Sequence, residues 1–160
     1  MADPSLKANS FNIRQLTPKD VALMEAMMTT FGEAFEEADT YTAARPGAEY
    51  MERLLSNQHF IALAALKHGN VVGGLTAYEL EKFEQERSEI YIYDLAVAAD
   101  QRRQGIATAL IEQLKTIAAG RGSYVIFVQA DLGDAPAISL YSGLGTCAKV
   151  LHFDINIAGP

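Results

Sequence analysis

Two neighbouring features of this sequence combine residue types that can do chemistry. Asp94 interrupts a run of apolar residues, and a polar stretch with two arginines and a glycine, residues 101–108, follows it. A carboxylate inside an apolar run is costly to bury without a partner or a task, such as binding an ammonium group or accepting its proton. Asp94 could instead form a structural ion pair or lie at a sheet edge.

The polar stretch predicts a phosphate site. The apolar, β-branched run of residues 90–97 predicts a strand, and Gly105 opens an amphipathic helix. The first amides of a helix have no intrahelical partners and lie at the positive end of its dipole, so they attract anions. The alternative is an ordinary loop with solvated arginines. The predicted anion-binding residues are Arg102, Arg103, Gln104, Gly105, Ile106, Ala107 and Thr108.

The elements around this stretch follow from apolar periodicity. We expect the order β-α-α-β-β-β-α-β-α-β, with a charged loop or frayed helix end over residues 32–41. The apolar run at 124–129 is typical of a parallel strand covered on both faces. The expected strands are 11–16, 60–66, 71–80, 88–97, 124–129 and 149–157. One expected helix begins after Thr17, and the others cover 48–55, 105–119 and 137–142.

Composition narrows the possible partners. The 160 residues predict one domain over 11–157, preceded by a loose segment, residues 1–10. A net charge of −7 argues against nucleic acid and anionic lipid, and it suits a cationic small molecule. No apolar run is long enough to cross a membrane, and the first residues do not form a signal peptide. With a single cysteine, these features predict a cytoplasmic protein. The three histidines lack metal-ligand spacing, so no metal is expected.

The motif from Asp94 to Ala107, together with the segment 137–145, resembles the GNAT acetyltransferases. The resemblance implies an α/β (α+β) GNAT fold. Its mixed, mostly antiparallel sheet has about six strands, including a parallel splayed pair, and about four helices flank it. It also implies acetyl-CoA as the cofactor, with its pyrophosphate in the loop. A β-bulge helps the parallel pair to splay, and the exposed backbone of Leu95, Ala96 and Val97 then binds the pantetheine arm.

A closer resemblance points to the acceptor. Residues 83–97, 102–111, 124–134 and 152–154 look like those of the type I aminoglycoside 3-N-acetyltransferases. That subfamily acetylates the 3-amino group of the 2-deoxystreptamine ring in gentamicin-like antibiotics and confers resistance, and a homodimer is expected. The alternatives are an acetyltransferase for a polyamine or other small amine, and a non-catalytic acyl-CoA-binding regulator.

The resemblance assigns roles to two side chains and a group of acids. Tyr141 would protonate the departing thiolate, although it could simply pack at the end of its helix. Asp94 would deprotonate or anchor the amine, and alternation predicts that it faces away from Tyr93, which would stack on a sugar or lie in the core. Each acid could also be a solvated surface charge. The predicted substrate-binding residues are Tyr93, Asp94, Glu37, Asp39, Glu84, Asp131 and Asp134.

Overall fold

The structure, a computed structural model, describes residues 10–159. The chain divides into two compact units, one ending at Val128 and the other beginning at Gln129, and each is described by itself. The single domain expected over 11–157 therefore stays a prediction. The loose N-terminal segment expected over 1–10 lies, except for its last residue, outside the described residues.

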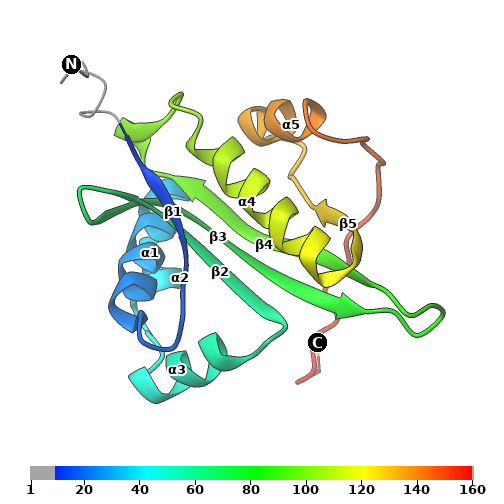
Figure 1. Cartoon of the computed structure of the whole chain (residues 1–160), viewed down its shortest axis with the longest axis horizontal. Helices are drawn as coiled ribbons and strands as arrows, with labels where there is room; N and C mark the ends of the chain where they lie inside the picture. Colours follow the sequence, from blue (N-terminus) through cyan, green and yellow to red (C-terminus); the bar gives the residue numbers. More distant parts are fainter. Residues whose placement is uncertain (1–9, 160) are drawn as a thin grey trace. The chain divides into compact units, whose positions relative to one another are not determined.

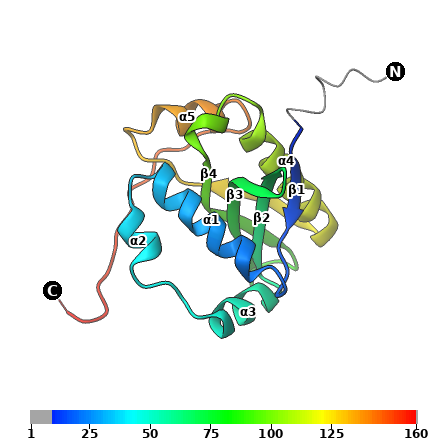
Figure 2. The same ribbon diagram turned by 90° about the vertical axis from the view of Figure 1, so that its left-hand side faces the viewer.

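The first unit is a five-stranded sheet in the order β1-β2-β3-β4-β5. Neighbouring strands are antiparallel from β1 to β4, and β4 and β5 are parallel. Three helices cover one face and α4 covers the other (Figures 1 and 2). The strands are β1 (Asn12–Gln15), β2 (Phe60–Lys67), β3 (Asn70–Glu81), β4 (Ser88–Val97) and β5 (Ser123–Val128). The helices are α1 (Val21–Ala34), α2 (Ala38–Thr42), α3 (Ala48–Ser56) and α4 (Ile106–Arg121).

The mixed α+β architecture with its parallel pair agrees with the prediction, but the sheet has five strands where about six were expected. The turn expected between the second and third strands is also present: β2 ends at Lys67 and β3 begins at Asn70. Both turn residues, His68 and Gly69, have positive φ, which matches the twist of a tight hairpin.

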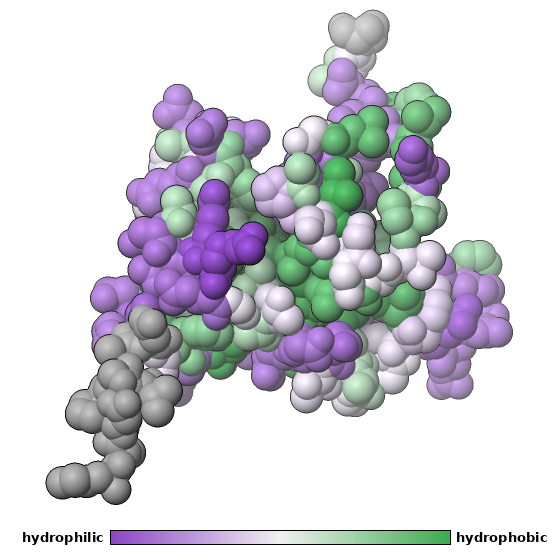
Figure 3. Space-filling view, turned by 90° about the horizontal axis from the view of Figure 1, so that it is seen from above, coloured by the Kyte–Doolittle hydropathy of each residue, from purple (hydrophilic) through white to green (hydrophobic). Residues whose placement is uncertain are grey.

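The core forms two layers, one on each face of the sheet. On one face, α1 and α3 bury Met27, Phe31 and Met51 against β2. On the other, Leu110 and Leu114 of α4 are fully buried. Hydrophilic residues are prominent on the surface shown in Figure 3. In the described part of the chain, no helix is both long and apolar enough to span a bilayer.

Three local predictions were wrong. The acidic segment 32–41, expected as a loop or frayed end, contains the end of α1 and most of the short helix α2. Residues 149–157, expected as a last strand, are irregular. Alternation shows which residues could share a face, but a strand forms only where a neighbouring strand completes its hydrogen bonds. β5 is parallel to β4, as expected, but Tyr124 and Val125 are 49% and 40% exposed, so residues 10–128 do not cover both of its faces.

The second unit, residues 129–159, contains one helix, α5 (Ala135–Ser142). Asp134 is the N-cap residue of α5, and its carboxylate accepts a hydrogen bond from the amide of Ala137 at 3.1 Å. Pro136 lies in the first turn, where its missing N–H costs no helical hydrogen bond.

We predict that Leu110→Ala lowers the free energy of unfolding by about 2–5 kcal/mol, because it opens a cavity beneath the helix that follows the polar stretch. The matched control is Leu132→Ala, since Leu132 is 90% exposed whereas Leu110 is completely buried. Urea denaturation measures both effects, and the control should change stability by less than about 0.5 kcal/mol. Equal losses in the two variants would contradict the buried position of Leu110.

Candidate active site

The segment between β4 and α4 places unpaired amides around the start of a helix. Its backbone turns through the left-handed region twice, at Arg103 with φ 65° and at Gly105 with φ 81°. Gly105 precedes α4, and no side chain caps its first turn, so the amides of Ile106, Ala107 and Thr108 have no partner within the helix. This arrangement suits a phosphate group.

Side chains tie this segment to the sheet. Arg102 Nε donates a hydrogen bond to the carbonyl of Val97 at 3.3 Å, which closes the loop onto the end of β4. Lys67 donates to the side chain of Gln101 at 3.2 Å. These contacts hold positive charge beside the start of α4, where it would complement an anion.

A β-bulge lies directly before Asp94. Asp94 pairs with Thr76, and Ile92 pairs with Ala77, so Tyr93 is an extra residue in β4. The Tyr93 ring packs against Tyr78 at 5.8 Å, and Tyr78 packs against the core formed with α1 and α3. Tyr93 and Asp94 therefore face the same side of the sheet. The prediction that they face opposite sides was wrong, because strict alternation ends where a bulge adds a residue.

The pairing of β4 with β5 ends at the same place. The register of β4 with β5 ends where Ile92 pairs with Val128, whereas β3 stays paired with β4 as far as Val97. Within residues 10–128, the backbone of Leu95, Ala96 and Val97 thus has a neighbouring strand on one side only. An extended ligand could add there as a further strand.

The Asp94 side chain lies between groups with opposite effects on its charge. Burial raises its pKa, the hydrogen bond from the Tyr41 hydroxyl at 3.2 Å lowers it, and the nearby charge of Glu37 raises it. The overall pKa is above the ordinary value for an aspartate. A carboxylate with a raised pKa is a stronger proton acceptor than a free one, so its setting suits a general base.

Aromatic rings extend from Asp94 across the same face of the sheet. Tyr93 contacts Tyr78 and Tyr91, and Tyr91 stacks on Phe127 with ring centroids 4.8 Å apart. Tyr93 is 63% exposed. A flat ring beside a carboxylate matches the apolar faces and cationic substituents of an amino sugar.

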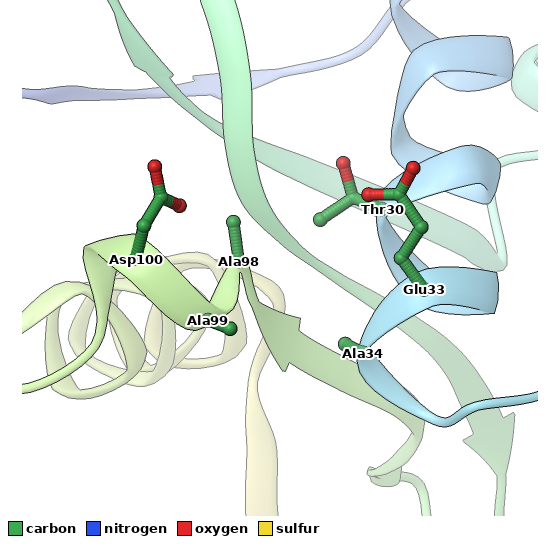
Figure 4. Close-up of a pocket in the computed structure, with 6 residues that line it drawn as sticks. All are labelled: Thr30, Glu33, Ala34, Ala98, Ala99 and Asp100. Carbon is green, nitrogen blue, oxygen red and sulfur yellow. The ribbon is translucent and has the colours of Figure 1, made fainter.

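A pocket of about 250 Å³ lies between α1 and the turn after β4. Figure 4 shows the carboxylates of Glu33 and Asp100 on opposite sides of it. Two carboxylates facing one pocket favour a cation over an anion. The other lining residues are Thr30, Ala34, Ala98 and Ala99.

The remaining predicted acids are in different places. Glu37 precedes α2 and lies near Asp94, and Asp39 lies in the exposed first turn of α2. Glu84 lies in the turn before β4, 3.5 Å from Lys82, and roughly 20 Å of strand separates that turn from Asp94. The structure therefore does not bring Glu84 and Asp94 together.

Three predicted residues belong to the second unit. Asp131 is exposed, and Asp134 caps α5. Tyr141 is partly buried in the last turn of α5, and both burial and the charge of Asp134 raise the pKa of its hydroxyl. A phenol that keeps its proton can serve as a proton donor.

The site also contains residues that the sequence analysis missed, above all Tyr41, Tyr78 and Tyr91. Tyr78 and Tyr91 directly oppose each other on adjacent strands, a pairing that the hairpin register could have indicated. Tyr41 reaches Asp94 across 53 residues of sequence, and no local pattern indicates that contact. Within residues 10–159, no three His, Cys, Asp or Glu side chains cluster as a metal site.

A family model described as "Acetyltransferase (GNAT) family" matches residues 21–146. Among curated proteins, rat N-acetyltransferase family 8 member 2 is 32% identical over 103 residues, which are 64% of this chain. The matched region spans 45% of that protein.

Solved structures match over nearly the full chain. The aminoglycoside acetyltransferase HMB0005, from an uncultured soil metagenomic sample, is 63% identical with a TM-score of 0.91, covering 92% of this chain and 99% of that one. The aminoglycoside acetyltransferase meta-AAC0020, from a similar source and in complex with sisomicin, is 31% identical with a TM-score of 0.87, covering 93% and 97% of the two chains.

We predict that Asp94→Asn stabilises the protein at pH 7, on the order of 0.5–1 kcal/mol, as is common when a functional site is relieved of strain. The amide can still accept the Tyr41 hydrogen bond but carries no charge to bury beside Glu37. Because the folded-state pKa of Asp94 is raised, its charge costs most above that pKa and the cost disappears as the carboxylate protonates. Urea denaturation at a series of pH values should show the difference shrinking as pH falls. A variant less stable than wild type at pH 7 would contradict this account.

Proposed function

Because the chain belongs to the GNAT family of acetyltransferases, we propose that it acetylates the 3-amino group of the 2-deoxystreptamine ring in gentamicin-like aminoglycosides. The observation that carries this proposal is the position of Asp94. Its partly buried carboxylate lies where β5 stops pairing with β4, directly before the open backbone of residues 95–97. An amine held by Asp94 is thereby next to an extended ligand arm bound along β4.

The chain's backbone fits acetyl-CoA, the acetyl donor of this family. The uncapped amides at the start of α4 would hold the pyrophosphate, with Arg102 and Arg103 adding positive charge. The open edge of β4 would pair with the pantetheine arm. A thioester supplies an activated acetyl group, and an amide near Leu95 or Ala96 would polarise its carbonyl.

The acceptor class rests on charge, shape and similarity. A net charge of −7, with acidic side chains at Asp94, Glu37 and Glu33, favours a polycation. The exposed ring of Tyr93 offers a surface for a sugar ring. A 63% identical relative is an aminoglycoside acetyltransferase, and a second relative binds sisomicin. The choice of the 3-amino group rests on the sequence resemblance.

Proton transfers through Asp94 and Tyr141 complete the proposed reaction. Asp94, directly or through a water molecule, takes a proton from the substrate ammonium, so that the free amine can attack the thioester carbonyl. As the carbon–sulfur bond then breaks, Tyr141 donates its proton to the departing sulfur, and the second proton that the new amide nitrogen loses passes through water to restore the phenol. The transfer is direct, with no acetyl group held on the enzyme.

We expect purified protein to release free thiol when mixed with acetyl-CoA and sisomicin, and NMR of the product to place the acetyl group on N3. The Asp94→Asn variant should lower kcat by about 10²–10⁴, the usual contribution of a general base.

The possible outcomes separate the alternatives. Acetylation at another nitrogen would overturn the 3-amino assignment and leave the acceptor class in place. Turnover of spermidine but of no aminoglycoside would replace that class with polyamines. Tight acetyl-CoA binding without turnover of any amine would indicate a regulator.

Replacing Tyr141 tests the proton donor. Tyr141→Phe removes the hydroxyl and keeps the ring, so kcat should fall by about 10²-fold while the Kd for acetyl-CoA stays within twofold. Stopped-flow turnover and isothermal titration calorimetry measure the two quantities. Parallel losses in rate and affinity would argue for a packing role instead.

A further inference from the structure

Asp94 has a partner outside its own strand. The Tyr41 hydroxyl of α2 donates a hydrogen bond to Asp94 Oδ1 at 3.2 Å. Partial burial, and the charge and hydrogen bond of Asp94, raise the pKa of Tyr41 far above that of a free tyrosine, so this hydroxyl stays protonated and acts as a donor at physiological pH.

The position of α2 is fixed by its packing on α1. A Cβ atom on Gly32 would lie 3.1 Å from the Ala38 Cα and 3.2 Å from the Tyr41 Cβ, so glycine permits this close approach. Glu36 turns the chain with φ 56°, and the amide of Glu37 donates to the carbonyl of Gly32 at 2.9 Å. These contacts leave α2 little freedom relative to α1.

Aromatic packing fixes the Tyr41 ring itself. It lies 6.1 Å from the ring of Phe31, in an edge-on arrangement, and 5.9 Å from the ring of Phe35. Phe31 is 2% exposed and belongs to the core. These ring contacts orient the Tyr41 side chain so that its hydroxyl lies beside β4.

The titratable groups facing Asp94 come from three parts of the fold: α2 with the residue before it, β3 and β4. From α2 come Tyr41 and the charge of Glu37, which precedes the helix. The hydroxyls of Tyr78 on β3 and Tyr91 on β4 are also within electrostatic reach of Asp94. Burial raises the pKa of both phenols, so they are neutral at physiological pH. Among these neighbours, Tyr41 provides the hydrogen bond that lowers the pKa of Asp94, and Glu37 provides a charge that raises it.

We propose that Tyr41 is a positioning residue: its hydroxyl holds the Asp94 carboxylate in place through their hydrogen bond. This inference rests on the proposed function, in which Asp94 takes the proton of the amine. The segment after α1 thereby sets the direction of the group that activates the substrate.

Substitutions of Tyr41 and Glu37 should shift the titration of Asp94 in opposite directions. Tyr41→Phe removes the hydrogen bond and retains the ring, so the pKa of Asp94 should rise. Glu37→Gln removes a negative charge, so the pKa should fall. In the pH profile of kcat/KM, the acidic limb should move to higher pH in the first variant and to lower pH in the second.

The decisive measurement needs no substrate. A ¹³C NMR titration of the aspartate carboxyl carbons, with Asp94 assigned by its loss in Asp94→Asn, gives the pKa of Asp94 in each variant. The matched control is Tyr124→Phe, since Tyr124 also donates to a carboxylate, Glu89, at 3.0 Å, but at the other end of β4. It should leave the Asp94 titration unchanged.

The outcomes distinguish this inference from the proposed function. Opposite shifts in the Tyr41→Phe and Glu37→Gln variants, with no shift in the control, support the positioning role. A Tyr41→Phe titration that coincides with wild type overturns it, even if the enzyme acetylates sisomicin. Shifted titrations in a protein that acetylates no aminoglycoside would leave Tyr41 as the partner of Asp94 and overturn the proposed acceptor alone. In an active enzyme, Tyr41→Phe should lower kcat by about tenfold or more.

Discussion

The bulge at Tyr93 is the constraint on which the candidate site depends. One extra residue in β4 places Tyr93 and Asp94 on the same face, and the pairing of β4 with β5 ends at the preceding residue, Ile92. The carboxylate, the exposed ring and, within residues 10–128, the backbone edge without a second neighbouring strand thus lie at one local departure from regular strand geometry. Loop and helix then follow within a few residues, so the proposed phosphate site lies close to the proposed base along the chain.

The electrostatics of Asp94 represent a compromise between stability and chemistry. Burial and Glu37 raise its pKa and thereby cost stability at neutral pH, whereas the hydrogen bond from Tyr41 recovers part of that cost. A fully solvated carboxylate would destabilise the folded state less, but it would be a weaker base. Gly32 allows the α1–α2 segment to pack closely, and the contacts of this segment determine how far the pKa of Asp94 lies above its ordinary value.

Sequence reasoning was strongest where function lies in one continuous segment. Gly105, the hairpin after Lys67 and the odd placement of Asp94 in an apolar run could all be read from local pattern. Tyr41 could not, because its role depends on a contact over 53 residues and on a helix of five residues, too short for periodicity to show. The alternation at 149–157 predicted a strand that the structure does not form, because alternation carries no information about a pairing partner. The bulge was expected from family resemblance, but its effect on the facing of Tyr93 was not.

The bulge also limits which insertions and deletions this part of the chain can accept. Side chains of a strand alternate, so deleting one residue of β4 near Tyr93 would restore regular alternation and turn one of the two, Tyr93 or Asp94, to the opposite face. Substitutions can alter the acceptor face residue by residue. An insertion or deletion between Ile92 and Gly105 would instead change the position of the Asp94 carboxylate relative to the start of α4. New substrate ranges should therefore arise in this chain through point substitutions here, with changes in length confined to loops elsewhere.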